Sequence, residues 1–123
     1  MTQKRRRLGQ LGERLAADHL THLGYEIVAR NYRCLEGEID LVTRYAGQWV
    51  FVEVRTRRGR RFGSPEESVT PRKRAHLIAS AQHYLQEHEA SSSDWRIDAV
   101  AIVFSPAGQL ERVDVIENAV AGS

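Results

Sequence analysis

The chain has 123 residues, of which 41% are hydrophobic and 28% are charged, as in a single globular domain with a real core. No apolar run approaches the roughly 20 residues that a membrane helix needs, and no signal-peptide core follows the N-terminus. The single cysteine, Cys34, excludes an internal disulfide and suits a reducing compartment. We therefore expect a cytoplasmic protein that makes no use of a membrane.

The net charge is only +2, but the positive charges are clustered in residues 4–7, 55–61 and 72–74. Such clusters are the electrostatic footprint of a protein that binds a phosphate backbone. A single basic run would more often serve solubility. Together they favour a nucleic-acid partner, DNA in the first place, with these candidate contacts outside the N-terminal run: Arg57, Arg58, Arg60, Arg61, Arg72 and Lys73.

The first predicted element is a helix over residues 8–23, whose leucines fall on one arc of a helical wheel. Glu13 lies at the edge of this arc. It either points toward a site at the sheet margin or stays in solvent near the helix start, where the helix dipole favours a negative charge. Gly24 ends the helix, and residues 25–32 then predict a strand.

The next two segments, residues 38–43 and 49–55, are apolar strands that nevertheless carry acidic side chains. Carboxylates are rarely buried unless they are paired or hold a metal. Residues 44–48 lie between the strands, and their glycine suits a tight turn. The sequence therefore predicts a β-hairpin with an acidic site.

With Ala46 and Gly47 as the turn residues, Asp40 faces Glu53 in this hairpin. By the same register Glu38 faces Arg55, and all of these side chains lie on one face. Opposed carboxylates would repel, whereas Mg²⁺ is commonly held by one or two carboxylates with water and phosphate. The alternative is a surface hairpin with a Glu–Arg pair and no site, and a one-residue bulge would break the register.

Residues 57–67 lack apolar periodicity and contain Gly and Pro, so they predict a loop. Thr70 and Pro71 are typical of a helix start, and this helix runs to about Glu89. Strands at residues 95–104 and 110–116 complete the order α-β-β-β-α-β-β. This order predicts an α/β domain with a mixed central sheet.

Several motifs also carry a family resemblance: Gly12-Glu13, Asn31-Tyr32-Arg33, Gly37-Glu38-Ile39-Asp40-Leu41 and Phe51-Val52-Glu53-Val54-Arg55. With this element order, they resemble the restriction-endonuclease-like fold. More closely, the chain resembles the YraN-like family of small bacterial proteins, which are relatives of archaeal Holliday-junction resolvases. The resemblance covers residues 8–117, which we expect to form the domain, between a basic tail at 1–7 and a frayed tail at 118–123.

The resemblance implies an endonuclease that uses Mg²⁺ or Mn²⁺, with Glu13, Asp40 and Glu53 as metal-facing acids. Asp40, Glu53 and Arg55 would be the catalytic residues. Arg55 departs from the wider pattern, which has Lys there, and Arg remains protonated in proteins. Lys73 on the second helix is a candidate replacement, although the sequence does not place it near the site. A homodimer follows from the resemblance alone.

Three interpretations of function stay open. The first is a metal-dependent phosphodiesterase that cuts DNA, branched DNA included. The second is a catalytically inactive nucleic-acid-binding module on the same fold. The third is a structural protein in which Asp40, Glu53 and Arg55 form an ion-pair network without metal.

Overall fold

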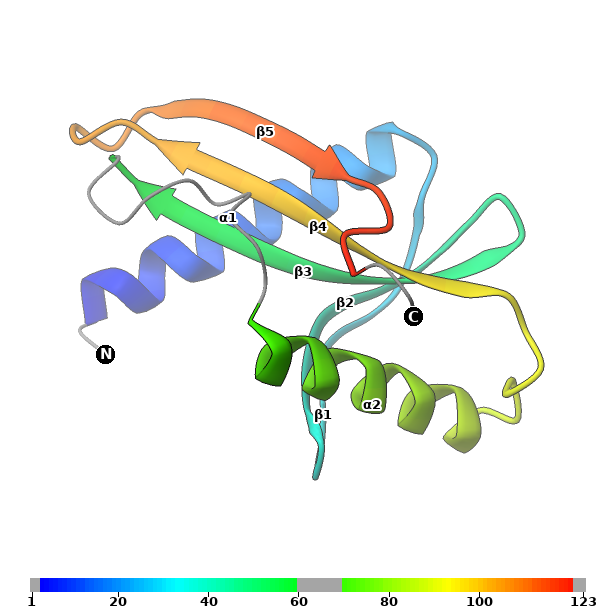
Figure 1. The fold of residues 1–123 in the computed structure, drawn as a ribbon. Coiled ribbons are helices and arrows are strands. Elements are labelled where there is room, and N and C mark those ends of the chain that lie inside the picture. The colour runs from blue at the N-terminus through cyan, green and yellow to red at the C-terminus, as the bar shows by residue number, and fades with distance from the viewer. Residues whose placement is uncertain (1–2, 60–69, 121–123) are drawn as a thin grey trace.

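The computed structural model describes the backbone of residues 3–59 and 70–120, and side chains from Arg7 onward in the first of these ranges. The order is α1 (Gln3–His22), β1 (Glu26–Cys34), β2 (Gly37–Tyr45), β3 (Gln48–Arg58), α2 (Pro71–Glu87), β4 (Trp95–Phe104) and β5 (Leu110–Ile116) (Figure 1). The expected mixed α/β architecture is confirmed. Neither described helix is both long and apolar enough to cross a membrane. The predicted contacts Arg60 and Arg61 lie outside the described residues.

The five strands form one sheet in the order β1-β2-β3-β4-β5. β1, β2 and β3 are an antiparallel meander. β3 and β4 pair in parallel, and the connection that such a pair requires contains α2. β5 returns antiparallel to β4 at the edge. The sheet is therefore antiparallel at both edges and parallel at one central pair.

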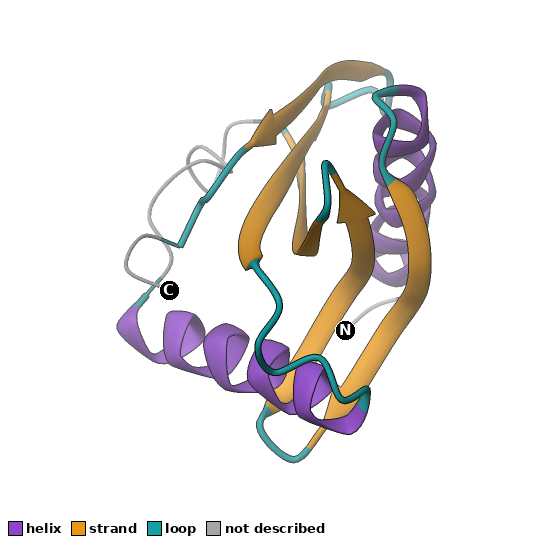
Figure 2. Cartoon of the chain, turned by 90° about the vertical axis from the view of Figure 1, so that its right-hand side faces the viewer, coloured by secondary structure: helices purple, strands orange, loops and turns teal. Residues whose placement is uncertain are grey.

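The two helices cover opposite faces of this sheet (Figure 2). Successive strand residues point to opposite faces, so the side chains of the sheet pack in two separate core clusters. α1 packs through Ala16, Ala17 and Leu20 onto one face, and α2 packs through Leu77, Ala81 and Leu85 onto the other. β4 lies between both layers, and its residues 97–102 are all buried, as expected for a strand that is covered on both faces.

α1 begins at Gln3, earlier than the predicted start at Leu8. Apolar periodicity marks only the buried face of a helix, and the basic run at residues 4–7 carries no apolar side chain. Lys and Arg are nevertheless good helix formers. The backbone of this run is therefore part of the helix.

The residues directly after β5 are packed against the rest of the chain. The backbone N–H of Asn118 donates to Asp98 Oδ1 at 2.8 Å. Val120 is only 2% exposed and belongs to the α2-side core. Two backbone hydrogen bonds, from Asn118 and from Ala119 to Ile97 O, and one apolar side chain therefore hold this segment.

Candidate metal-binding site at the end of the hairpin ladder

The β2–β3 hairpin has the predicted turn and register. Ala46 and Gly47 both have positive φ angles, 52° and 79°, as a two-residue type I′ turn requires. From this turn the antiparallel ladder runs without a shift to the pair formed by Leu41 and Val52. The local sequence is sufficient for this part because turn type sets the register of a hairpin.

The ladder ends one step before the acidic pair. Asp40 and Glu53 would be the next partners, but β2 and β3 no longer pair there. Instead, Asp40 Oδ2 accepts a 2.7 Å hydrogen bond from the backbone N–H of Val54. The predicted direct opposition of Asp40 and Glu53 is therefore wrong as a backbone pairing, although the two residues remain neighbours.

The cause is a change of face in β2. Ile39 packs in the α2-side core, whereas Leu41, two residues later, packs in the α1-side core. Residues two apart in a regular strand share a face, so the backbone is irregular at Asp40. Glu38 therefore pairs with Arg33 of β1, with 3.7 Å between Glu38 Oε2 and Arg33 Nε, and not with Arg55 in the β2–β3 ladder.

Asp40 sits among other carboxylates. Burial raises the pKa of Asp40 to about 7; the Val54 hydrogen bond opposes this rise, and the charges of Glu13, Glu53 and Glu38 add to it. Like charges around a desolvated carboxyl favour its protonated form. The structure thus brings together all three acids predicted to face a metal.

Glu13 reaches this cluster from α1. Because the helix begins at Gln3, Glu13 is not in its first turn, and the alternative of a solvated glutamate near the helix start is wrong. Burial raises the pKa of Glu13, and the charge of Glu38 adds to this effect; a hydrogen bond from Asn31 and the charge of Arg30 oppose it. Glu13 therefore faces the sheet margin.

Glu53 is held by cations from two elements. Arg55 Nη2 lies 3.7 Å from Glu53 Oε2, and Lys73 Nζ lies 3.3 Å from Glu53 Oε1. The side chains of Glu53 and Arg55 are only 14% and 11% exposed. Lys73 of α2 therefore lies beside Glu53, whereas the β3 triplet has arginine, Arg55, at its third position.

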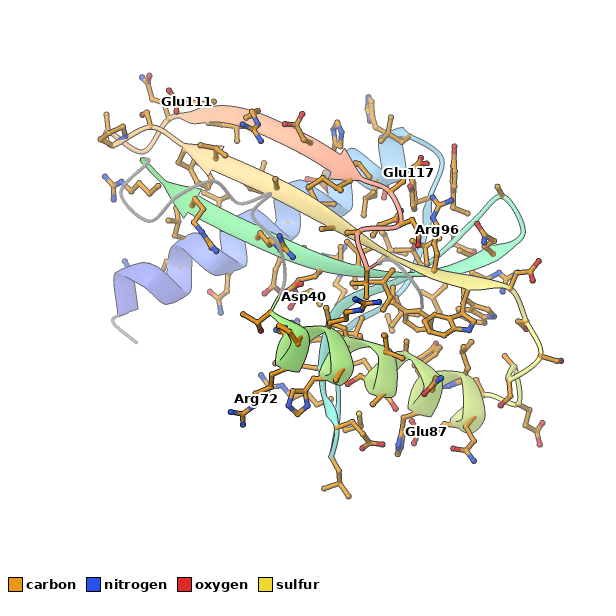
Figure 3. All side chains as sticks on the ribbon, in the orientation of Figure 1. Asp40, Arg72, Glu87, Arg96, Glu111 and Glu117 are labelled. Carbon is orange, nitrogen blue, oxygen red and sulfur yellow. The ribbon has the colours of Figure 1, made fainter. Side chains whose placement is uncertain are left out.

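The first turn of α2 places Lys73 there. Thr70 caps the helix by accepting a 3.2 Å hydrogen bond from the backbone N–H of Lys73, and Pro71 starts it. In the view of Figure 3, Asp40 projects near the end of α2 that carries Arg72, whereas Glu87 marks the opposite end. The N-terminus of a helix also favours negative ligands.

An open pocket of about 650 Å³ adjoins Glu13 on the α1 side of the sheet. Its lining includes the cations of Arg7, Arg14 and Arg30. Of these, Arg14 and Arg30 were not among the predicted binding residues. The spacing in the sequence could have identified Arg14, because Arg7 and Arg14 are two helical turns apart and share a face of α1.

The predicted contacts on β3 lie elsewhere. Arg57 Nη1 donates to Thr56 O at 2.9 Å, and Arg58 Nε donates to Pro106 O at 3.0 Å. At roughly 3.3 Å per residue, Arg58 is about 16 Å along the strand from Glu53. Arg58 therefore borders the β4–β5 turn, and neither arginine belongs to the acidic cluster.

Glu13, Asp40 and Glu53 do not form a closed cage. Among the described residues, one group of three or more His, Cys, Asp or Glu side chains has its ligand atoms within 4.8 Å of one another, and it lies outside this cluster. Mg²⁺ needs no such cage, since it keeps several waters and takes one or two carboxylates with substrate phosphate. The oxygen donors and the mutual repulsion at Asp40 fit such an ion.

The fold and this cluster define a mixed α/β protein with an acidic site where β2 and β3 stop pairing. Residues 12–102 match the uncharacterised protein family UPF0102. The chain is 50% identical over 121 residues to a UPF0102 protein of Roseiflexus castenholzii, covering 98% of each chain. It is 45% identical over 119 residues to one of Dehalococcoides mccartyi, covering 97% of each. The chain belongs to this family, which confirms the YraN-like resemblance.

Proposed function

We propose that the protein is a divalent-metal-dependent endonuclease that hydrolyses phosphodiester bonds in DNA, branched DNA included. The observation that supports this most is Asp40, a desolvated carboxyl beside three other carboxylates. Asp40 and Glu53 would hold Mg²⁺ or Mn²⁺, with Glu13 as an additional or outer ligand. Such an ion polarises the phosphoryl oxygen and lowers the pKa of its bound water.

The cations at Glu53 have separate roles in this proposal. Arg55 stays charged and stabilises negative charge on the scissile phosphate. Lys73, 51% exposed and 3.3 Å from Glu53, can contact phosphate as a compact, flexible cation. Arg55 stands where the wider nuclease pattern has lysine, which was the reason to consider an inactive binding module. This reason is weak, because Lys73 of α2 places a lysine at the same site.

The path of the nucleic acid is proposed to follow the cationic surfaces beside the acids. Arg7, Arg14 and Arg30 line the pocket at Glu13, and Arg72 is exposed at the start of α2. Such side chains bind phosphates without regard to base sequence. Arg57 and Arg58 remain proposed contacts further along β3. Arg60 and Arg61, which lie outside the described residues, also remain proposed contacts.

A structural role is the second candidate, and one observation favours it. Glu53 already has two cationic partners in the absence of any metal. Ion-pair networks of this kind also perturb neighbouring carboxyl groups. Under this candidate the protein binds no divalent ion at the cluster.

The test is cleavage of duplex, nicked and four-way-branched DNA by the purified full chain with Mg²⁺, with Mn²⁺ or with a chelator. We expect metal-dependent cleavage that falls about 100-fold or more in Asp40→Asn, Glu53→Gln and Lys73→Met. Glu111→Gln, an exposed acid on β5, should leave the rate unchanged. Cleavage that survives Asp40→Asn contradicts the proposal. Absent cleavage together with no Mn²⁺ binding by calorimetry favours the structural role.

A further inference from the structure

The β1–β2 turn lies directly on α2, away from the acidic cluster. The Nδ1 atom of His76 is 2.5 Å from the backbone oxygen of Glu36. Gly37 has a φ of +149°, and a Cβ there would be 3.1 Å from Ser80 Oγ and 3.5 Å from His76 Cβ. The missing side chain of Gly37 thus lets the turn approach the helix. This contact holds the residues that precede Gly37 over one face of α2.

Three metal-ligating side chains converge at this contact. Cys34, Glu36 and His83 bring one ligand atom each within 4.8 Å of one another, and all three residues are partly buried. His83 Nδ1 is already 2.8 Å from Glu36 Oε1. Bonds of about 2.0–2.3 Å in tetrahedral geometry place ligand atoms roughly 3.5 Å apart. Side-chain rotations that move the ligand atoms by about 1 Å would therefore bring them to these distances around an ion.

The other nitrogen of His83 also has a suitable neighbour. His83 Nε2 is 3.7 Å from Glu87 Oε1, one helical turn further along α2. Glu87 in turn accepts a short hydrogen bond from the hydroxyl of Tyr32 on β1. Metal-bound histidines commonly direct their second ring nitrogen to a carboxylate, which fixes the ring and raises its basicity. Tyr32 and Glu87 would hold His83 in this orientation.

We propose that Cys34, Glu36 and His83 bind a borderline-soft divalent ion, Zn²⁺ in the first place, with a fourth position open to water or another ligand. Thiolate, imidazole and carboxylate form a donor set typical of zinc. The acidic cluster offers only oxygen donors and suits a hard ion such as Mg²⁺. The two sites share no residue, so this inference stands independently of the endonuclease proposal.

The sequence does not show that the three metal-ligating side chains lie close together. Cys34 and Glu36 are close in the chain, whereas His83 lies far beyond them, after the whole hairpin and the start of α2. No short Cys/His motif connects them, and their spacing along the chain matches no zinc-binding motif. The group exists because α2 packs across the end of the β1–β2 hairpin.

The test is a Co²⁺ titration of the reduced, metal-free full chain, followed by displacement with Zn²⁺ and calorimetry. We expect one thiolate-bound Co²⁺ per chain, seen as a thiolate-to-cobalt charge-transfer band that Cys34→Ser abolishes. Glu36→Gln and His83→Gln should each weaken Zn²⁺ binding at least about tenfold, since even outer partners are worth that much. His22→Gln, an exposed histidine on α1, should change nothing. Asp40→Asn should also leave the band intact.

Two results would overturn the proposal. One is Zn²⁺ binding that is equally tight in Cys34→Ser, and the other is binding that Asp40→Asn removes. Circular dichroism checks that each variant folds. If Cys34→Ser does not fold, the unaltered chain gives the answer. Stoichiometric Zn²⁺ should then slow alkylation of Cys34, and an unchanged alkylation rate rejects the site.

Discussion

The sequence around Asp40 is that of a regular strand, but the backbone of β2 is irregular at this residue. Its carboxylate accepts the N–H of Val54, and this single hydrogen bond does not offset burial and the neighbouring acids. A proton or a cation would each relieve the repulsion, so a proton would compete with the proposed metal ion for this carboxyl group. The cost of holding this group in the fold is typical of a functional residue, since binding and catalytic sites often reduce stability.

The raised pKa predicts how stability depends on pH. With a folded pKa of about 7 and an ordinary value of 3.8, Asp40 keeps its proton in the folded state at pH values where the unfolded chain has lost it. The free energy of unfolding should therefore fall as pH rises from about 4 to about 7, by at most about 4 kcal/mol. Urea unfolding in a chelator, repeated across this range, measures the effect.

Asp40→Asn is the matched variant, because an amide keeps an oxygen for Val54 but carries no charge. It should show a flatter pH profile than the unaltered chain and be more stable above about pH 7. Parallel profiles for the two proteins would show that Asp40 does not titrate in this range.

At the scale of elements, α1 approaches β3 through a glycine. A Cβ added to Gly12 would be 2.1 Å from Thr56 Oγ1, whereas one added to Gly9 would meet nothing within 4 Å. Gly12 was recognised in the sequence only as part of a family motif. The structure supplies its physical reason: the helix backbone must contact the strand, and this contact sets the position of the adjacent Glu13.

Two glycine substitutions should therefore have opposite effects. Gly12→Ala should destabilise the protein by about 1–3 kcal/mol through overpacking, while Gly9→Ala should stabilise it by roughly 0.5–1 kcal/mol through helix propensity. Adding Thr56→Ala to Gly12→Ala should recover part of the loss. Urea denaturation measures the free energy of unfolding of the unaltered chain, the two single glycine variants and the double variant. Equal effects at the two glycines would show that the close approach of α1 is not strained by a methyl group.

At the scale of the whole molecule, one buried charge joins segments that are far apart in the chain. Asp98 on β4 is fully buried. It accepts hydrogen bonds from Arg96 Nε at 3.0 Å, from the Tyr25 hydroxyl at 3.1 Å and from the Asn118 backbone at 2.8 Å. The connection from α1 to β1, the strand β4 and the segment after β5 therefore meet at one carboxylate. The role of Asp98 is therefore structural.

Removal of this carboxylate should strongly destabilise the fold. Asp98→Ala leaves Arg96 without its buried partner and should lower the free energy of unfolding by about 3–5 kcal/mol. Asp114→Ala breaks the half-exposed pair with Arg112 on β5 and should cost about 0–1 kcal/mol. The midpoint of urea unfolding compares the two variants. Similar small losses would mean that water replaces the Asp98 contacts.

Local chemistry accounts for what could be predicted. Ala46-Gly47 specified the hairpin turn and its register, Thr70-Pro71 marked the start of α2, and the apolar run at 95–104 marked the buried strand. Each depends on residues that are neighbours in the chain. The acids Asp40 and Glu53 were identified for the same reason, since carboxylates in apolar strands need no tertiary information to be unusual.

The chain by itself determined the family, the mixed α/β class and the residues of the acidic cluster. Only the tertiary structure decided that β2 leaves the ladder at Asp40, that Lys73 reaches Glu53, and that His83 meets Cys34 and Glu36. The physical reason is that turn type and periodicity act over a few residues, whereas these contacts arise from strand irregularity and from two helices packing on opposite faces of the sheet.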